Sequence, residues 1–259
     1  MKKGNYKLTV GWLYPDLMST YGDRGNIICF KRRSEWRNIK TEVFPIEVGL
    51  SNKHIENCDL IIGGGAQDRQ QEIVIKDLLS KKTVYKKLFK RGIPGLFVCG
   101  SPQLLGHYYM TANGKKLPGL DIFDFVTKHF GNNKPRCIGN TAGELIPNSK
   151  FQIPNSKKTI VGFENHGGRT YLGSNCKPFA KVLKGYGNNG EDGYEGALYN
   201  NVIACYYHGP FLPKNPHIAD WLITKSLEIK YEKSIELEPL DDALEWRAHE
   251  FILHKLGVR

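Results

Sequence analysis

GLFVCGSPQLLG, residues 95–106, is the segment from which the architecture of this chain can be worked out. Residues 96–98 form a short apolar run that is typical of a buried strand. Gly100 and Ser101 follow Cys99 and are small enough for a sharp turn into a helix, which would leave the cysteine sulfur exposed above the sheet. Amides at the start of that helix would favour the thiolate and also bind an oxyanion. The same residues are compatible with Cys99 as a small apolar residue at a strand end.

Strand-like and helix-like stretches alternate before this segment. The expected strands are residues 8–13, 41–48 and 58–62, and the expected helices end near residues 38 and 91. Such alternation predicts an α/β fold with a largely parallel sheet flanked by helices. Ligand sites in these sheets form beyond the carboxyl ends of the strands. Both Cys99 and the glycines 63–65 would lie at such ends.

The second half of the chain has a different pattern, mainly of short strands. A helix is expected to contain residues 107–109, and two further helices are expected at 216–231 and from about 240 to 256. The short strand candidates are 136–146, 159–164, 181–183 and 202–207. The last of them ends on His208, which again places a reactive group at a strand terminus. We find no repeat and no linker, so we expect a single domain over residues 1–259 with a C-terminal helix from about 240.

Composition excludes several classes of protein. The net charge of +11 comes from lysines spread along the chain, without the clustered basic stripe of a nucleic-acid-binding protein, so we expect no nucleic-acid partner. No apolar run is long enough to span a membrane, and the N-terminus lacks the apolar region of a signal peptide. The six cysteines have neither CxxC nor zinc-finger spacing, which favours free thiols in a reducing compartment. We therefore expect a cytoplasmic protein.

The triple glycine Gly63-Gly64-Gly65 follows the third expected strand. Glycines allow a ligand or an oxyanion to approach the backbone closely, because no Cβ stands in the way. A phosphate-binding loop is the rival functional interpretation, but the lysine spacing of a P-loop and the dinucleotide fingerprint are both missing. A flexible turn is the simpler alternative.

Three stretches carry a resemblance to a known family: CGSPQLLG (99–106), GFENHGGRT (162–170) and HGPFLPKNP (208–216). Together they resemble the cobyric-acid-synthase-like group of class I glutamine amidotransferases, over about residues 10–222. The resemblance implies the α/β class I glutamine amidotransferase fold and hydrolysis of L-glutamine. It also implies transfer of the ammonia to a MurT-like Mur ligase subunit in a heterodimer. That partner would amidate the D-glutamate of lipid II to D-isoglutamine, which brings the pair to the inner face of the membrane.

The same resemblance assigns roles to individual positions. It implies no cofactor and no metal in this chain, with ATP and Mg²⁺ expected on the partner subunit. It implies Cys99 as the nucleophile, His208 as the base, Arg136 and Gln103 as substrate-binding residues, and Gly64, Gly65 and Gly100 around the oxyanion. From the residues alone, Cys99 would attack the side-chain amide of glutamine and His208 would protonate the departing ammonia.

One departure from the family concerns the carboxylate that orients the histidine. Many class I glutaminases have a glutamate two residues after the histidine, where this chain has Pro210. A cysteine–histidine pair works best when a third group fixes the imidazole tautomer. We therefore expect the partner subunit to supply this carboxylate, with Glu164 as the nearest alternative within the chain. Asp23 and Asn26 could order a loop near the site, but capping of the helix that follows is the simpler interpretation.

Two questions stay open at this stage. His166 is a rival base, although a hydrogen-bonded loop histidine is an equally good interpretation. The chain could also be a non-catalytic regulatory subunit that keeps an amidotransferase fold, or a stand-alone γ-glutamyl hydrolase with the same cysteine–histidine chemistry. Retention of Cys99, His208 and Arg136 favours catalysis.

Overall fold

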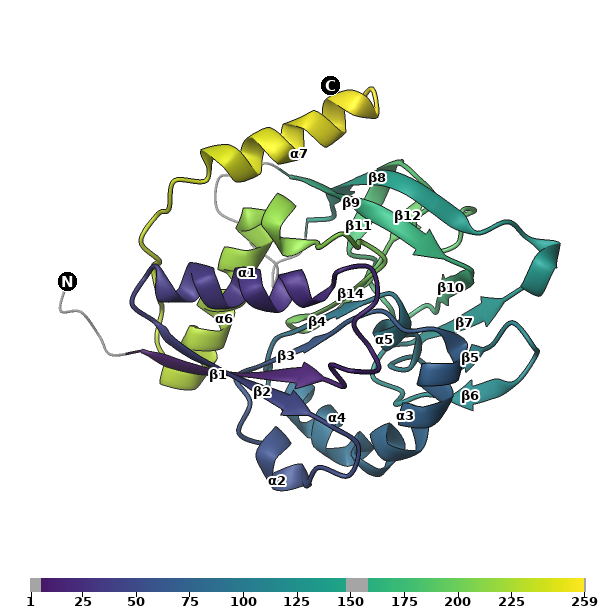
Figure 1. Ribbon diagram of the computed structural model, residues 1–259, viewed down its shortest axis with the longest axis horizontal. Helices are drawn as coiled ribbons and strands as arrows, with labels where there is room; N and C mark the ends of the chain where they lie inside the picture. The colour runs from purple at the N-terminus through teal and green to yellow at the C-terminus, as the bar shows by residue number, and fades with distance from the viewer. Residues whose placement is uncertain (1–5, 148–157, 259) are drawn as a thin grey trace.

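The computed structural model describes residues 6–147 and 158–258, and a six-stranded sheet forms its centre (Figure 1). In spatial order its strands are β13 (Ala197–Tyr199), β14 (Val202–Cys205), β4 (Gly95–Val98), β3 (Leu60–Gly63), β1 (Lys7–Leu13) and β2 (Lys40–Ile46). All neighbours pair in parallel except β13, which is antiparallel to β14. The prediction of an α/β fold with a largely parallel sheet is confirmed.

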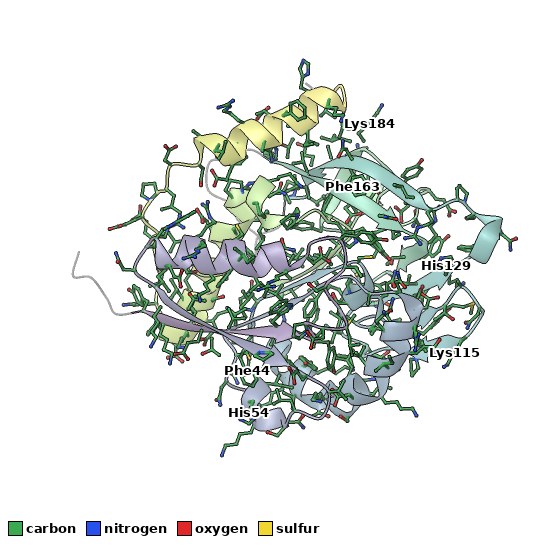
Figure 2. The ribbon with its side chains drawn as sticks, in the orientation of Figure 1. Phe44, His54, Lys115, His129, Phe163 and Lys184 are labelled. Atoms are coloured by element: carbon green, nitrogen blue, oxygen red, sulfur yellow. The ribbon has the colours of Figure 1, made fainter. Side chains whose placement is uncertain are left out.

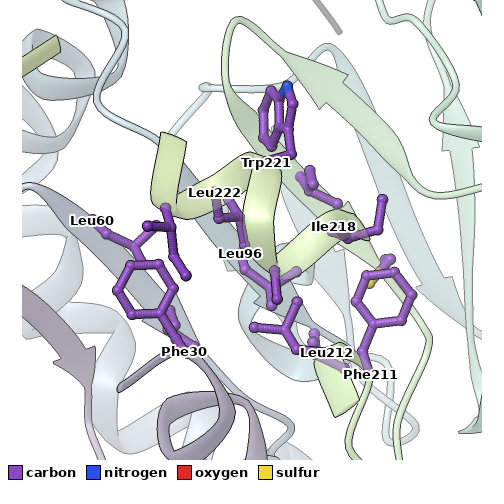
Figure 3. Close-up of a cluster of buried hydrophobic side chains, with 14 of the residues drawn as sticks. Phe30, Leu60, Leu96, Phe211, Leu212, Ile218, Trp221 and Leu222 are labelled. Carbon is purple, nitrogen blue, oxygen red and sulfur yellow. The ribbon is translucent and has the colours of Figure 1, made fainter. Parts of the chain in front are cut away.

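Side chains of β4 point alternately to the two faces of this sheet. Leu96 and Val98 join a buried cluster with residues of α1 (Arg24–Glu35) and α6 (Pro216–Tyr231), shown in Figure 3. Phe97 lies in a second cluster, with residues of α3 (Asp68–Ser80) and α4 (Lys82–Lys90) on the opposite face. The short helix α2 (Asn52–Ile55) follows β2. Because both faces of β4 are covered, its sequence is apolar throughout and does not alternate.

Two four-stranded sheets extend the molecule beyond the carboxyl edge of the central sheet (Figure 1). One has the order β10 (Gly168–Leu172), β7 (Phe125–His129), β5 (Tyr108–Met110), β6 (Lys116–Pro118). The other has the order β12 (Tyr194–Glu195), β11 (Ala180–Lys184), β8 (Cys137–Leu145), β9 (Thr159–His166). Their pairing is antiparallel except between β5 and β7. A short 3-10 helix, η1 (Gly131–Asn133), joins the two sheets.

Two of the expected helices are wrong in detail. Residues 108–110 form strand β5, because Tyr109 is buried between two partner strands while its neighbours are half-buried; the helix after Cys99, α5 (Gly100–Gln103), is a single turn. The long helix expected to end near residue 91 is divided into α3 and α4 at Lys81, whose buried ammonium pairs with Asp77. No helix in the described ranges is long and apolar enough to cross a membrane.

The last helix, α7 (Ala243–Lys255), begins at Ala243, close to the predicted residue 240. A buried arginine of α1 holds its start: Arg33 donates to Asp242 at 2.5 Å and, through Nε, to Asp220 of α6 at 2.8 Å. Further along α7, His249 donates from Nδ1 to the carbonyl of Lys214 at 2.8 Å. Lys214 ends η2 (Leu212–Lys214), which follows the His208 loop, so α7 supports the segment that carries the histidine.

Candidate active site

Cys99 lies in a strained turn at the end of β4. Its backbone has φ 58° and ψ −97°, in a region that non-glycine residues rarely occupy. Such a conformation costs about 1–3 kcal/mol and is characteristic of functional sites. The turn is held by the Cys99 amide, which donates to the carbonyl of Cys205 on the neighbouring strand at 2.8 Å. A Cβ on Gly100 would lie 2.5 Å from the Ala66 nitrogen, which explains the glycine. The predicted sharp turn is confirmed, but Cys99 is only 7% exposed, so the expectation of an exposed sulfur is wrong.

His208 reaches Cys99 because β14 and β4 are parallel neighbours and both end at the same edge of the sheet. Two backbone hydrogen bonds tie His208 to Phe163 of β9, one of 2.8 Å and one of 3.2 Å; Phe163 is labelled in Figure 2. The ring is fully buried, and its Nε2 has no hydrogen-bond partner among residues 6–147 and 158–258. Burial lowers the pKa of His208, but the charge of Cys99 and the hydrogen bond and charge of Asp23 outweigh burial and raise it.

The carboxylate that orients this histidine is Asp23. The Nδ1–H of His208 donates to Oδ1 of Asp23 at 3.1 Å, across 185 positions of sequence. The other oxygen, Oδ2, accepts from the Gly65 amide at 2.6 Å, and the side chain is 2% exposed. The expectation that the partner supplies the carboxylate is therefore wrong. The prediction that Asp23 caps the following helix is wrong as well, because its side chain makes no cap hydrogen bond to α1.

Pro210, which stands where many family members have glutamate, supports the same arrangement. A Cβ on Gly25 would lie 2.4 Å from Cγ of Pro210, so the proline packs directly against the start of α1. Asn26 adds a polar contact, since its Oδ1 accepts from the Leu212 amide at 2.9 Å. The histidine loop and the Asp23 loop are thus held together without the missing glutamate.

Glu164 and His166, the alternatives considered from sequence, have other partners. The buried carboxylate of Glu164 accepts from the amides of Tyr186 and Gly187 at 2.8 and 3.0 Å, so it holds that turn. His166 donates from Nδ1 to the carbonyl of Gly168 at 2.7 Å and stacks on Tyr206, with ring centroids 3.7 Å apart. Burial lowers the pKa of His166, which keeps its ring neutral. His166 therefore forms part of the cavity wall and does not act as the base for Cys99.

Gly64 and Gly65 have no Cβ, so the side chains of Asp23 and His208 can lie close to the backbone of this loop. A Cβ on Gly65 would lie 2.8 Å from Cε1 of His208, and one on Gly64 would lie 2.8 Å from Cβ of Asp23. The expectation that Gly65 serves the oxyanion is wrong, since its amide is already bound to Asp23. The next residue, Ala66, lines the cavity in front of Cys99, and its nitrogen lies beside Gly100.

A cavity of about 350 Å³ opens in front of the cysteine and brings Cys99, Gln103 and Arg136 together. Gln103 is buried and held on both sides: its Oε1 accepts from Gln71 at 2.9 Å and its Nε2 donates to Tyr206 at 3.3 Å. Arg136 is exposed, and its Nη2 donates to Oδ1 of Asn165 at 2.9 Å. Within the described ranges, no group of three or more His, Cys, Asp or Glu side chains is arranged to hold a metal ion.

Arg169 is a supporting residue that the sequence did not single out. It is 4% exposed, and its Nη2 donates to the carbonyl of Pro135 at 2.6 Å while its Nη1 donates to the carbonyl of Asn189 at 3.1 Å. Nη1 also contacts the sulfur of Cys137. Arg169 thus braces the residues on both sides of Arg136. The only signal in the sequence is its place at the end of the GFENHGGR stretch.

Comparisons with known proteins agree with this geometry. The model of the CobB/CobQ-like glutamine amidotransferase domain matches residues 9–216. The subunit GatD of lipid II isoglutaminyl synthase (glutamine-hydrolyzing) from Staphylococcus aureus (strain N315) is 39% identical over 254 residues, 96% of each chain. The subunit of the same name from Streptococcus pneumoniae (strain ATCC BAA-255 / R6) is 39% identical over 246 residues, 94% of this chain and 90% of that one.

A solved structure supports the fold independently of close sequence similarity. A crystal structure of a glutamine amidotransferase superposes with a TM-score of 0.56 at 14% identity, covering 84% of this chain and 98% of that one. At this identity the likeness concerns the fold alone. The family model spans most of the described chain and includes both Cys99 and His208. The chain therefore belongs to the CobB/CobQ-like glutamine amidotransferase family.

Proposed function

We propose that this chain is the glutamine-hydrolysing subunit of a lipid II isoglutaminyl synthase. The observation that carries the proposal is the His208–Asp23 contact at the strand edge that also carries Cys99, together with the cavity that Cys99 and Arg136 line. The 39% identity to two subunits of that name, over nearly the whole chain, supports the assignment. The chain works in the cytoplasm, at the inner face of the membrane through the lipid substrate, and as a heterodimer with a MurT-like ligase subunit.

The chemistry is acyl transfer in two steps. The Cys99 thiolate attacks the side-chain amide carbon of L-glutamine, and a C–S bond forms while the carbonyl oxygen becomes an oxyanion. The His208 imidazolium, held by Asp23, gives its proton to the leaving nitrogen, and the C–N bond breaks to release ammonia. Water then attacks the thioester with His208 as base, which yields L-glutamate and the free thiol.

The amides of Ala66 and Gly100 hold the oxyanion. Neither amide is used in the backbone hydrogen bonds of the turns and loops in the described ranges, and the Ala66 nitrogen lies beside Gly100. Two preorganised donors aimed at the developing charge stabilise the transition state more than the ground state. Gly64 and Gly65 contribute indirectly, by giving Asp23 and His208 room to approach.

The ammonia is used by the partner. This chain needs neither a cofactor nor a metal for hydrolysis, and ATP and Mg²⁺ belong to the ligase subunit, which activates the D-glutamate of lipid II. To test this, glutamate release from L-glutamine would be measured for the chain alone and with the partner, and D-isoglutamine formation would be followed with lipid II and ATP. We expect hydrolysis by the chain alone, and amidated lipid II only with both subunits.

The alternatives give different results in the same assay. A non-catalytic regulatory subunit would release no glutamate with or without the partner; the convergence of Asp23, His208 and Cys99 disfavours this alternative. A stand-alone γ-glutamyl hydrolase would release glutamate from γ-glutamyl peptides, and its hydrolysis of glutamine would not change when the ligase subunit and lipid II are added. Either result would contradict the proposal.

Arg136 binds the α-carboxylate of glutamine through a bidentate, charge-assisted pair. Arg136→Lys keeps the charge but loses the planar fork, so we expect KM for L-glutamine to rise about tenfold with a smaller change in kcat, because ground and transition states share this contact. Lys134, whose ammonium pairs with Glu191, provides the control: Lys134→Ala should leave KM unchanged. A fall in kcat at constant KM for Arg136→Lys would instead assign Arg136 to the chemistry.

A further inference from the structure

One acidic side chain lies among the described residues that line the cavity in front of Cys99, and the mechanism above does not use it. Asp68 is the first residue of α3. Its Oδ1 accepts from the hydroxyl of Tyr109 at 2.7 Å, and its Oδ2 accepts from the amide of Ala112 at 2.8 Å. Two donors from the β5–β6 hairpin therefore fix the direction of the carboxylate, while each oxygen keeps acceptor capacity for a ligand.

The cavity is also lined by Arg136 and by His129, the last residue of β7, which is labelled in Figure 2. Burial lowers the pKa of His129, Asp68 opposes this shift, and Arg136 adds to it, so both charges act on the same ring. The ring is neutral, because its Nδ1 accepts from the Gly131 amide at 2.9 Å. The lining of one cavity thus includes a negative group, a positive group and a neutral ring.

Asp68 lines the same cavity as the nucleophile Cys99. The pKa of Tyr109 is raised, first by burial, then by its hydrogen bond to Asp68, and further by the charge of Cys99. Tyr109, which donates to Asp68, lines the cavity together with Cys99. Gln103, a buried polar side chain that also lines the cavity, is already hydrogen-bonded to Gln71 and Tyr206.

We propose that Asp68 binds the α-ammonium group of the substrate glutamine, opposite Arg136 on its α-carboxylate, and so selects free glutamine. This inference rests on the proposed function. Glutamine is a zwitterion, and moving its ammonium out of water without a counter-charge is costly. Arg136 and Asp68 match its two charges while the side-chain amide extends toward Cys99. Glutamine that lacks the amino group would leave Asp68 without its ligand.

A purely structural role is the competing interpretation, because an acidic residue in the first turn of a helix stabilises that helix and Asp68 anchors the β5–β6 hairpin. The two interpretations differ in one measurable quantity. A structural defect lowers activity toward every substrate alike, whereas loss of an ammonium-binding group lowers activity only toward substrates that carry the ammonium.

The test compares kcat/KM for L-glutamine and for glutaramate, the analogue without the α-amino group, in the wild type and in Asp68→Asn. We expect the wild type to prefer glutamine by at least about 100-fold, because a site built for a charged donor rejects the analogue lacking it. In Asp68→Asn this ratio should fall at least about tenfold, mainly through a higher KM for glutamine. Asp121→Asn, at the exposed pair with Lys82, is the matched control and should keep the wild-type ratio.

An unchanged ratio in Asp68→Asn would overturn the inference. If that variant does not fold, Tyr109→Phe removes one of the two donors that hold the carboxylate and should still lower the ratio; an unchanged ratio in this variant would overturn the inference as well. Failure of the proposed function is distinguishable from either result, because the wild type itself would then not hydrolyse L-glutamine.

Discussion

Cys99→Ala should abolish glutamine hydrolysis, with kcat reduced by more than about 10⁴-fold. The thiolate forms the covalent intermediate, and no other described side chain that lines the cavity is a cysteine or a serine. Alanine lacks the nucleophile but differs little in volume, so the fold and partner binding should be retained. Glutamate release would be measured alongside the melting temperature and complex formation with the ligase subunit.

Cys176→Ala is the matched control for this variant. Cys176 is half-buried and lies outside the cavity, and burial raises the pKa of its thiol to about 12, so it is protonated and unreactive at neutral pH. Its removal should leave turnover unchanged. Substantial turnover by Cys99→Ala would contradict the assignment of the nucleophile. His208→Ala should lower kcat nearly as much, because members of such a site act as a unit. Normal turnover by His208→Ala would make His166 the candidate base again.

The central sheet, and the positions of Cys99 and His208 at the ends of two strands, could be predicted from local sequence. Residues 96–98 are apolar because β4 is covered on both faces, and the small residues after Cys99 permit the strained turn. The pairing of β4 with β14 then brings Cys99 and His208 to one edge. These features depend on patterns within a few residues, or on the general rule that parallel strands end at a common edge.

The role of Asp23 could not be predicted from local pattern, because an aspartate before a helix is normally a cap. Its true partners, His208 and Gly65, are distant in sequence, and their contacts depend on how the loop after β1 folds back over the glycine loop. A signal was nevertheless present. Since β1 also ends at the carboxyl edge, a carboxylate in the loop that follows it was a candidate for the site on topological grounds.

The small sheets were harder to predict for a different reason. Strand β5 is only three residues long, and its pairing with both β6 and β7 outweighs any local preference of Tyr108 and Tyr109. Pairing across sequence gaps of this kind is not visible in periodicity. The same sheets carry Arg169, His129 and the Asp68 contacts, so the cavity wall was the least predictable part of the site.

Asp23→Asn should lower kcat for glutamine hydrolysis by about 10²–10⁴-fold while leaving KM nearly unchanged, because the asparagine no longer holds the His208 imidazolium in its catalytic tautomer. Since Asp23 helps to raise the pKa of His208, its loss should lower that pKa. Activity that depends on the imidazolium would then fall at a lower pH, so the alkaline limb of the pH–rate profile should move toward neutral. A merely structural defect would lower the profile without moving it.

Asp16→Asn, in an exposed position of the preceding turn, is the matched control and should retain both kcat and the pH profile. The wild-type chain alone already has the carboxylate on Nδ1 of His208, so it should hydrolyse glutamine without the ligase subunit. If kcat for the isolated wild-type chain were negligible and Asp23→Asn had no effect in the complex, the orienting group would have to come from the partner after all. A normal kcat and pH profile for Asp23→Asn in the isolated chain would show that the 3.1 Å contact does not serve catalysis.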